Sequence, residues 1–520
     1  MDFARNASSS SQSAIDELTA YGRFTTDVLV IGSGPGGAAA TYGLAHSGSR
    51  VLVAERGTDL PFITREEITT AMYIDKKYTN SGEWYDASTG KAFTPGTYYY
   101  LGGNTRFYGA ALPRFRAQDF DRTTMQEGVS QPWPFGYEDL EPFYTEVEKL
   151  YRVHGSLGED PTEPEHSEDF PFPALAHEPA IERFSDSLRR QGLHPYHSAN
   201  GLEVKTQAER EEERGSDGTP SFAGRKSDSW NRLLKPAFEA DPNISVVTDL
   251  LITKLVQSED GTKLVGAEAV YNGRAVLIEA DRIVLAAGAG NTAALLLQSG
   301  VGNSSGMVGR NYMVHNTSFL VGISPFRRNR TAWQKTIGIN DWYLRDGARP
   351  PLGNAQMLGK LGAEALKGFF PYLPKFLLKL VTDRSLDMCL ITEDVADPEN
   401  RITVDGGRLF VRWKRNNLGA HRELVRNVRS AVRKAGFPIT FTRLMGIATN
   451  SHMCGTAVAG TDPKTSVVDA DCRSHDIENL WIVDSSIFPS SAASNPVLTI
   501  SANALRVAAK IRAEVSLERA

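Results

Sequence analysis

A glycine-rich turn between two apolar runs constrains the fold of this chain more than any other feature. Residues 27–40 read DVLVIGSGPGGAAA, and residues 50–57 read RVLVAERG. Gly32, Gly34 and Gly37 have the spacing of a dinucleotide-binding βαβ unit, where they permit the turn, the approach of a pyrophosphate and close helix packing. Glu55 ends the second run, where a carboxylate can accept hydrogen bonds from ribose hydroxyls. We therefore predict a dinucleotide site rather than a purely structural turn.

Composition excludes several other classes. The chain has 520 residues, enough for two domains, and a formal net charge of -5 without a basic block, so we expect no nucleic-acid partner. Cys389, Cys454 and Cys472 have no metal-ligand spacing, which predicts buried thiols and no metal site. The Ser-rich N-terminus lacks the apolar core of a secretory signal, and no apolar run is long enough to span a bilayer. We expect a cytoplasmic enzyme.

Other segments indicate the organisation of the chain. Apolar residues at helical spacing predict an amphipathic helix within residues 133–151, and a β-meander follows from residue 244 to a buried strand at 283–287. The segment 207–228 is dense in charge, Gly, Ser and Pro, which predicts an exposed loop, with 209–218 as a gate. Residues 363–381 are apolar and aromatic but contain Pro371 and Pro374. We interpret them as a lid or a homo-oligomer contact, with a membrane-surface helix as the alternative.

Several further motifs carry a resemblance to a known family. They are LGGNTRFYG at 101–109, IVLAAGAGNTAALLLQSG at 283–300, VGRNYMVHN at 308–316, and the block at 451–511 that begins SHMCGTAVAG. Together with the glycine turn, they resemble the glucose–methanol–choline (GMC) family of FAD-dependent alcohol oxidoreductases. WPFGYEDLEPFY, GGNTRFYGAALPRF and the triplet SNP at 494–496 are most similar to pyranose oxidases and bacterial glycoside 3-oxidases.

The resemblance implies an α/β fold in two parts. A discontinuous, Rossmann-like FAD-binding domain would comprise residues 20–125, 236–318 and 445–515. A substrate-binding domain, a β-sheet backed by helices, would comprise residues 126–235 and 319–444.

The resemblance also implies the catalytic residues. His452 would be the general base that takes the hydroxyl proton, and its alternative is a hydrogen-bonded core histidine. Asn495 would bind the substrate oxygen through its amide, and its alternative is the N-cap of a helix that starts at Pro496 and ends near residue 508. The positive end of that helix, at Pro496, would face the flavin and stabilise its reduced form. The remaining histidines, His315 and His421 among them, are expected to be structural or exposed.

Further residues are expected to hold FAD. Gly103, Asn104 and Thr105 form a turn that would contact the flavin, and Asp484 follows an apolar strand, where it either contacts the cofactor or caps the strand end. In pyranose oxidases that bind FAD covalently, a histidine follows the paired glycines. Phe107 stands at that position here, so the resemblance implies noncovalent FAD.

The predicted reaction is the oxidation of a secondary ring hydroxyl, at position 2 or 3 of a sugar or glycoside, with molecular oxygen or another electron acceptor. Two alternatives stay open within the family: a dehydrogenase of another alcohol, and a lyase that contains FAD without net redox chemistry. A protein that keeps FAD only as a structural element is disfavoured, because both His452 and Asn495 are present.

Overall fold

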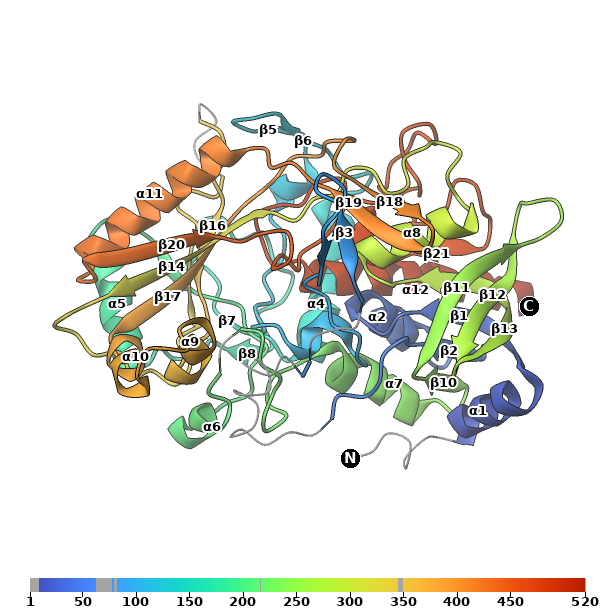
Figure 1. The fold of residues 1–520 in the computed structure, drawn as a ribbon, viewed down its shortest axis with the longest axis horizontal. Coiled ribbons are helices and arrows are strands. Elements are labelled where there is room, and N and C mark those ends of the chain that lie inside the picture. The colour runs from blue at the N-terminus through green and yellow to red at the C-terminus, as the bar shows by residue number, and fades with distance from the viewer. Residues whose placement is uncertain (1–8, 62–76, 79–81, 216, 345–348, 520) are drawn as a thin grey trace.

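The computed structural model describes residues 9–61, 77–78, 82–215, 217–344 and 349–519. Two large sheets dominate it, one at each end of the long axis (Figure 1). Each sheet has its own group of covering helices, and the cavity described below is lined from both. The structure therefore has the predicted mixed α/β architecture, while the boundaries of the two predicted domains stay predictions.

The seven-stranded sheet contains the glycine-rich unit. Its strand order is β10-β2-β1-β13-β12-β11, with β21 beside the end of β13. Neighbours among β10, β2, β1, β13 and β21 are parallel, and β11, β12 and β13 form an antiparallel meander, as predicted, except that β10, the first strand of the predicted meander, pairs with β2 instead. The apolar runs suit central strands that are buried on both faces. The bounds are Arg23–Ile31 (β1), Val51–Ala54 (β2), Ile244–Val247 (β10), Leu250–Gln257 (β11), Leu264–Tyr271 (β12), Arg274–Leu285 (β13) and Leu480–Ile482 (β21).

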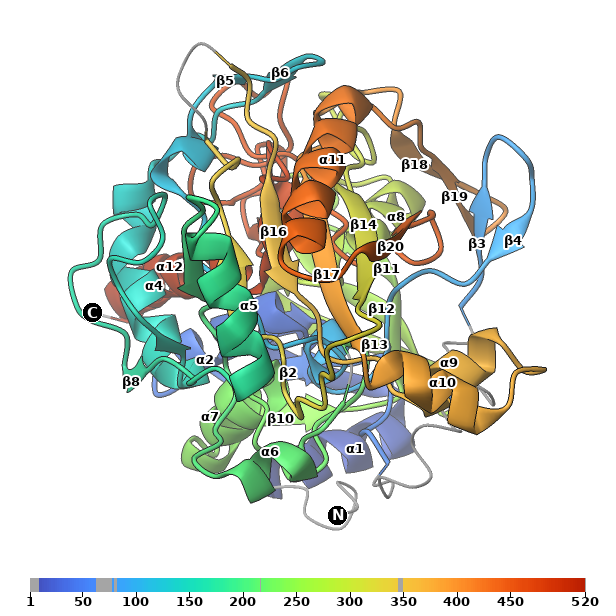
Figure 2. The same cartoon turned by 90° about the vertical axis from the view of Figure 1, so that its left-hand side faces the viewer.

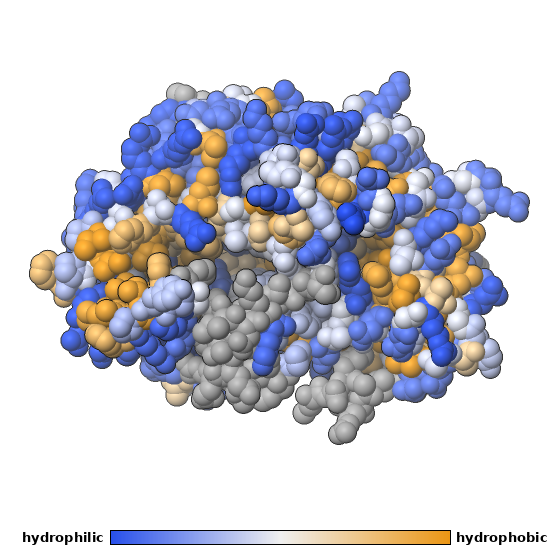
Figure 3. Space-filling model, in the orientation of Figure 1, coloured by the Kyte–Doolittle hydropathy of each residue, from blue (hydrophilic) through white to orange (hydrophobic). Residues whose placement is uncertain are grey.

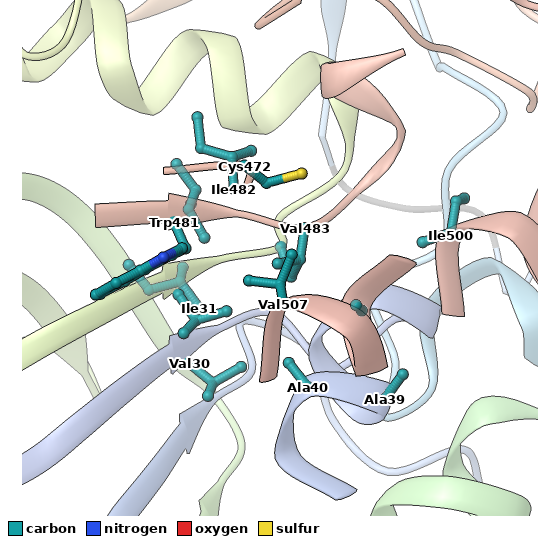
Figure 4. Packing of buried hydrophobic residues seen from close by; sticks show 14 of the residues in the cluster. Val30, Ile31, Ala39, Ala40, Cys472, Trp481, Ile482, Val483, Ile500 and Val507 are labelled. Atoms are coloured by element: carbon teal, nitrogen blue, oxygen red, sulfur yellow. The ribbon is translucent and has the colours of Figure 1, made fainter. Parts of the chain in front are cut away.

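Small residues bring two helices close together against this sheet. Helix α2 (Pro35–Leu44) packs along α12 (Val497–Arg519), and Ala39 and Ala40 belong to the buried cluster of Figure 4, together with Val507 of α12. A Cβ at Gly43 would lie 2.7 Å from the Cβ of Ala508, so the contact tolerates no larger side chain there. The close packing fixes the start of α12 relative to the glycine turn. Helix α12 begins one residue later than predicted and ends eleven residues later.

The six-stranded sheet separates a core from a cavity. Its order is β20-β14-β17-β16-β15-β9, antiparallel throughout. Helices α11 and α5 cover one face, which is toward the viewer in Figure 2, and pack on Leu320 and its neighbours. Thr317 and Phe319 alternate with Leu320 along β14 and line the cavity on the other face. The bounds are Pro195–His197 (β9), Asn316–Ile323 (β14), Ile337–Ile339 (β15), Asn354–Met357 (β16), Ser385–Thr392 (β17), Ile439–Leu444 (β20), Pro179–Arg189 (α5) and Leu418–Lys434 (α11).

Smaller elements complete the described chain. A four-stranded sheet consists of β3 (Trp84–Asp86), β4 (Ala92–Phe93), β18 (Arg401–Asp405) and β19 (Arg408–Arg412), and two strand pairs consist of β5 (Thr123–Thr124), β6 (Val129–Ser130), β7 (His154–Gly155) and β8 (Phe172–Pro173). The remaining helices are α1 (Ser9–Tyr21), α4 (Tyr137–Tyr151), α6 (Gln207–Glu212), α7 (Lys235–Ala240), α8 (Ala289–Ser299), α9 (Ala363–Phe369) and α10 (Lys375–Thr382). Short turns of helix are η2 (Gly103–Arg106), η3 (Ala117–Phe120), the π-helical η4 (Trp230–Leu234) and η5 (Ser485–Ile487). The predicted helix within 133–151 is α4. All three cysteines are buried and free, as predicted.

The charged segment 207–228 is not the exposed loop that its composition predicts. It starts as α6, and its second half turns inward around Glu213, of which only 3 % is exposed. The Glu213 carboxylate accepts hydrogen bonds from the Ser221 hydroxyl at 2.7 Å and from the N–H groups of Phe222, Ala223 and Arg225 at 2.9 to 3.1 Å. The prediction was wrong because these donors replace water around the buried charge.

Residues 363–381 fold into α9 and α10, with Pro371 and Pro374 between the two helices. Phe376 is 70 % exposed, and apolar side chains gather at the left of Figure 3, around α10 and β20. The lid, oligomer and membrane-surface interpretations of this segment stay predictions. Among the described residues, no helix is both long and apolar enough to cross a bilayer.

Candidate active site

The three glycines of the first turn occupy three different environments. Gly32 has φ of +99°, and a Cβ there would lie 2.5 Å from the Ala286 carbonyl oxygen. A Cβ on Gly37 would lie 1.9 Å from the oxygen of Gly32, because α2 sits directly on the end of β1. A Cβ on Gly34 would meet no protein atom within 4 Å, and Gly34 faces a large cavity. Gly32 and Gly37 therefore serve packing, whereas Gly34 leaves space for a ligand.

Glu55 holds the turn in place. Its carboxylate accepts hydrogen bonds from the Ser33 N–H at 3.1 Å, the Ser33 hydroxyl at 2.5 Å and the Gly57 N–H at 2.8 Å. Burial raises the pKa of Glu55, while these donors lower it. An ionised carboxylate has about four acceptor positions, so one remains for a ribose hydroxyl.

The turn of Gly103, Asn104 and Thr105 lies against the glycine turn. A Cβ on Gly103 would be 3.2 Å from the Cα of Gly34. The Asn104 amide accepts a hydrogen bond from the Tyr98 N–H at 2.8 Å and donates one to the Gly96 carbonyl at 3.1 Å, and the Thr105 hydroxyl donates to the Gly102 carbonyl at 2.6 Å. These bonds hold the shape of the turn. We therefore expect its contacts with the flavin to come mainly from the backbone.

Asp484 ties two chain segments together at the carboxyl ends of the parallel strands. Its carboxylate accepts hydrogen bonds from the Gly288 N–H at 2.8 Å, the Thr292 hydroxyl at 2.5 Å and the Ser486 N–H at 2.8 Å. Burial raises the pKa of Asp484. The strand-end cap is therefore present, and contact with a cofactor stays a prediction.

One cavity of about 920 Å³ brings the predicted residues together. Ten of the eleven predicted site residues line it, and Gly37, which packs beneath the turn, is the exception. Those that line it are Gly32, Gly34, Glu55, Gly103, Asn104, Thr105, His452, Asp484, Asn495 and Pro496. Crevices at the carboxyl ends of parallel strands are the usual ligand sites of such sheets.

The residues present fit FAD. The first turn of α2 has no side-chain cap, so its N–H groups are available to an anion beside the open space at Gly34. Glu55 keeps an acceptor for ribose. Phe107 lines the cavity and stacks on Tyr98, with 4.2 Å between ring centroids. A phenyl ring offers no nitrogen for a covalent bond to the cofactor.

His452 lies between β20 and β21 and is half-buried at the cavity wall. Burial, together with the neighbouring His315 and Lys335, lowers the pKa of His452 to about 3. The ring is therefore neutral at physiological pH and has a lone pair that can accept a proton. Its Nδ1 atom lies 3.4 Å from Nδ1 of His315.

The amide of Asn495 has a defined orientation. Its Oδ1 accepts a hydrogen bond of 2.7 Å from Nε2 of Gln356, in β16. The Asn495 Nδ2 group is therefore left to donate to a substrate oxygen. Helix α12 begins at Val497, and the Pro496 carbonyl accepts the hydrogen bond of Ile500 at 2.9 Å. Pro496 is therefore the N-cap residue, because its carbonyl accepts the first hydrogen bond of the helix while its own backbone lies outside it. Asn495, the predicted N-cap, lies one residue before that position.

Several residues near His452 and Asn495 could not be identified from the sequence. They lie in the six-stranded sheet, on its cavity side, or in segments next to it. Lys335 is 2 % exposed and forms an ion pair with Asp217, which also accepts a hydrogen bond from the Gly359 N–H at 2.8 Å. The predicted gate 209–218 therefore reaches the cavity through Asp217. Strand alternation could have indicated Thr317, but nothing local in the sequence pairs Lys335 with Asp217. The missed residues are Asp217, His315, Thr317, Lys335 and Gln356.

Comparison with protein families gives two matches. Residues 99–317 match the N-terminal model, and residues 397–504 the C-terminal model, of a family described as GMC oxidoreductase. The two matched regions include Gly103, Asn104, Thr105, His452, Asp484 and Asn495.

Individual relatives span nearly the whole chain. A 6'''-hydroxyparomomycin C oxidase of Streptomyces lividus is 29% identical over 95% of this chain and 92% of its own length. A paromamine 6'-oxidase of Streptomyces fradiae is also 29% identical, over 94% and 92%. A 2-methyl-1,2-propanediol dehydrogenase of Mycolicibacterium austroafricanum is 26% identical over 92% and 94%.

Solved structures share the fold. A pyridoxine 4-oxidase from Mesorbium loti superimposes with a TM-score of 0.65 at 21% identity, covering 93% of this chain and 98% of its own. A formate oxidase gives a TM-score of 0.65 at 17% identity, with coverages of 94% and 98%.

Proposed function

Because the chain belongs to the GMC oxidoreductase family, whose members bind FAD and oxidise CH–OH groups, we propose that it oxidises a secondary ring hydroxyl of a sugar or glycoside to a ketone. The observation that carries the proposal is the cavity that His452 and Asn495 share with the glycine turn at Gly34. The two Streptomyces relatives, which are named for aminoglycoside substrates, support a sugar-like substrate.

The chain's own residues have separate tasks in this reaction. The Asn495 Nδ2 group donates a hydrogen bond to the substrate hydroxyl oxygen and orients it. His452, neutral because of its burial, accepts the hydroxyl proton. FAD, when bound, supplies the acceptor for the hydride that leaves the substrate carbon. The carbon–oxygen single bond thereby becomes a carbonyl, with the proton on the histidine ring.

The polar wall next to His452 suits a substrate with several hydroxyl groups. Thr317, Lys335 and Gln356 contribute a hydroxyl, an ammonium and an amide from the six-stranded sheet or the segment before it. Lys335 already pairs with Asp217, and Gln356 with Asn495, but each keeps further hydrogen-bonding capacity, which the several hydroxyl groups of a sugar ring can use and a simple aliphatic alcohol cannot.

We propose that FAD is held noncovalently, since Phe107 stands where a histidine would form the covalent bond. Denaturation with acid should release all the flavin into the supernatant. Flavin that remains with the precipitate would contradict this assignment.

Oxidation of a different alcohol is the second candidate, and the similarity to the propanediol dehydrogenase favours it. Position 2 or 3 of the ring remains the proposal for a sugar substrate. The electron acceptor, whether molecular oxygen or another compound, the cytoplasmic location and a homo-oligomeric state also remain predictions.

An anaerobic titration tests the proposal. The holoenzyme is mixed with free sugars, O- and C-glycosides, amino sugars and simple diols, and loss of the oxidised flavin absorbance is followed. Bleaching by a sugar or glycoside, with a 2- or 3-keto product by NMR, would support the proposal. Oxidation at position 6 would support a sugar substrate but contradict oxidation of a ring hydroxyl. Bleaching by diols alone would favour the second candidate, and no bleaching by any alcohol would refute both.

A further inference from the structure

His315 occupies an unusual position directly before β14. It is 1 % exposed, and its backbone has φ of +65°, in the left-handed region that residues other than glycine rarely adopt. Backbone strain of this kind persists only where surrounding contacts enforce it, and it concentrates at functional sites. His315 was expected to be structural or exposed, but its ring contacts that of His452 edge to face, with 5.2 Å between ring centroids.

Both nitrogens of the His315 ring have partners. Nε2 lies 2.8 Å from the carbonyl oxygen of Ser491, and Nδ1 lies 3.4 Å from Nδ1 of His452. A carbonyl oxygen only accepts hydrogen bonds, so Nε2 of His315 must carry a hydrogen. In a neutral ring, Nδ1 then has none and can only accept. The hydrogen between the two rings therefore belongs to Nδ1 of His452.

A buried carboxylate fixes this arrangement from the other side. Asp394 accepts hydrogen bonds from the N–H groups of Val314 and His315 and from the Ser491 hydroxyl, each at 2.9 Å. It therefore holds both the backbone of His315 and the residue whose carbonyl binds the His315 ring. Asp394 contacts no ring nitrogen in the described hydrogen bonds, so its part is to place the two segments.

We infer that His315 is a positioning residue that keeps His452 in its Nδ1–H tautomer, which leaves the lone pair of Nε2 to accept the substrate proton. The inference deepens the proposed function and rests on it for the role of His452. In the opposite arrangement, with a proton on both nitrogens of His315, the hydrogen of His452 would move to Nε2. The His452 ring would then have no free lone pair to accept the substrate proton.

Burial and the positive charge of Lys335 favour the neutral form of the His315–His452 pair, against the opposing effect of Asp394. Burial lowers the pKa of His315, and Asp394 opposes this by favouring the cation. Lys335, on the segment that leads into β15, adds a positive charge near His452 and disfavours protonation of that ring. Since the two rings lie together away from bulk water and share one hydrogen bond, an additional proton, which would give the pair a positive charge, is unfavourable at neutral pH.

Ring nitrogen chemical shifts test the tautomer directly. The holoenzyme is labelled with ¹⁵N-histidine and measured at neutral pH by solid-state NMR, and the His452→Gln variant assigns the signals of His452 among the ten histidines. We expect the shift of a protonated nitrogen at Nδ1 and of an unprotonated nitrogen at Nε2. A proton on Nε2 of His452, alone or together with one on Nδ1, would overturn the inference. This measurement needs no substrate, so its outcome is independent of whether a sugar reduces the flavin.

Two matched variants test the consequence. His315→Asn tolerates a left-handed backbone and places an oxygen acceptor near the original Nδ1, whereas His315→Leu has a similar size and no acceptor. We expect His315→Leu to lower the limiting rate of flavin reduction roughly tenfold to a hundredfold, as losses of orienting partners do elsewhere, without changing the Kd for the substrate. His315→Asn should recover most of the rate.

The outcomes separate positioning from packing. Equal losses in both variants, or a His315→Leu enzyme with the normal rate and normal His452 tautomer, would overturn the inference. If His315→Leu does not fold, the tautomer of the unmutated enzyme and the pH profile of His315→Asn decide. The acid limb of that profile should stay where it is in the unmutated enzyme, because the acceptor is kept, and a displaced limb would count against the inference.

Discussion

Gly34 separates binding of FAD from folding more sharply than any other site residue. Its backbone, with φ of -64° and ψ of -172°, is open to any residue, and an added Cβ would meet no protein atom within 4 Å. In Gly34→Val, the cost to folding is therefore limited to the poorer N-cap of α2, about 1 kcal/mol. The added methyl groups would occupy the space where the backbone approaches the pyrophosphate. We expect FAD to bind at least about a hundredfold more weakly, which corresponds to ~2.7 kcal/mol.

Gly37→Ala is the matched control, because it adds a single methyl group at a position that packs beneath the turn and does not line the cavity. Its Cβ would lie 1.9 Å from the oxygen of Gly32, and neither backbone segment can move without disturbing β1 or α2. Overpacking of this kind costs typically about 1–3 kcal/mol. The control should therefore lower stability more than Gly34→Val does, with or without FAD, whereas Gly34→Val should chiefly lower the retention of FAD.

The assay has two independent readouts. Flavin retained after gel filtration, together with the Kd from fluorescence titration, reports binding. Thermal unfolding of flavin-free protein reports folding, and flavin must be absent because bound FAD itself would raise the Tm of the unmutated protein. A yellow Gly34→Val protein with an unchanged Kd would refute the placement of the pyrophosphate. A Gly34→Val apoprotein as unstable as Gly37→Ala would refute the packing argument.

Three further predictions concern the catalytic wall and the core. His452→Ala should keep FAD but slow flavin reduction at least about a hundredfold, and a near-normal rate would remove His452 from the mechanism. Asn495→Leu should slow the same step about tenfold or more, because it removes the amide that donates to the substrate oxygen. Gln356→Leu should slow it less, because the loss of Gln356 only allows the Asn495 amide to rotate. A larger effect of Gln356→Leu would contradict the role of Asn495 as donor. His421 is 2 % exposed with a pKa of about 4, lowered chiefly by burial, so the unfolded chain takes up its proton first as the pH falls. Between pH 7 and pH 5, the free energy of unfolding measured with urea should fall by about 2 kcal/mol more in the unmutated protein than in His421→Gln. Equal decreases in the two proteins would contradict a buried, neutral His421 ring.

Much of the cofactor side could be predicted because its determinants are local. The requirement for glycine at positions 32 and 37 follows from the backbone of one strand, one turn and one helix, and the glycine at position 34 leaves the space that a pyrophosphate would need, so a short stretch of sequence records all three. Glu55 follows in the next strand at a fixed spacing. Asn495 and Pro496 were found through a resemblance, and even there the start of α12 was placed one residue too early.

The charged segment shows where local reasoning fails. Composition around Glu213 indicates an exposed loop, because charge and turn residues are usually solvated. The structure buries that carboxylate among N–H donors from the same segment. Whether a charge is buried depends on whether donors converge on it, and this depends on the path of the chain rather than on composition.

By itself, the sequence determined the dinucleotide unit, the buried thiols and the identity of the groups that can do the chemistry. Only the tertiary structure decided which partners those groups have. His315 and His452 are 137 residues apart, and Gln356 and Asn495 are 139 apart, yet each pair shares a hydrogen bond. The physical reason is that hydrogen bonds are directional and short in range. The protonated nitrogen of a histidine, or the outward-facing atom of an amide, is set by the one neighbour that folding brings within about 3 Å.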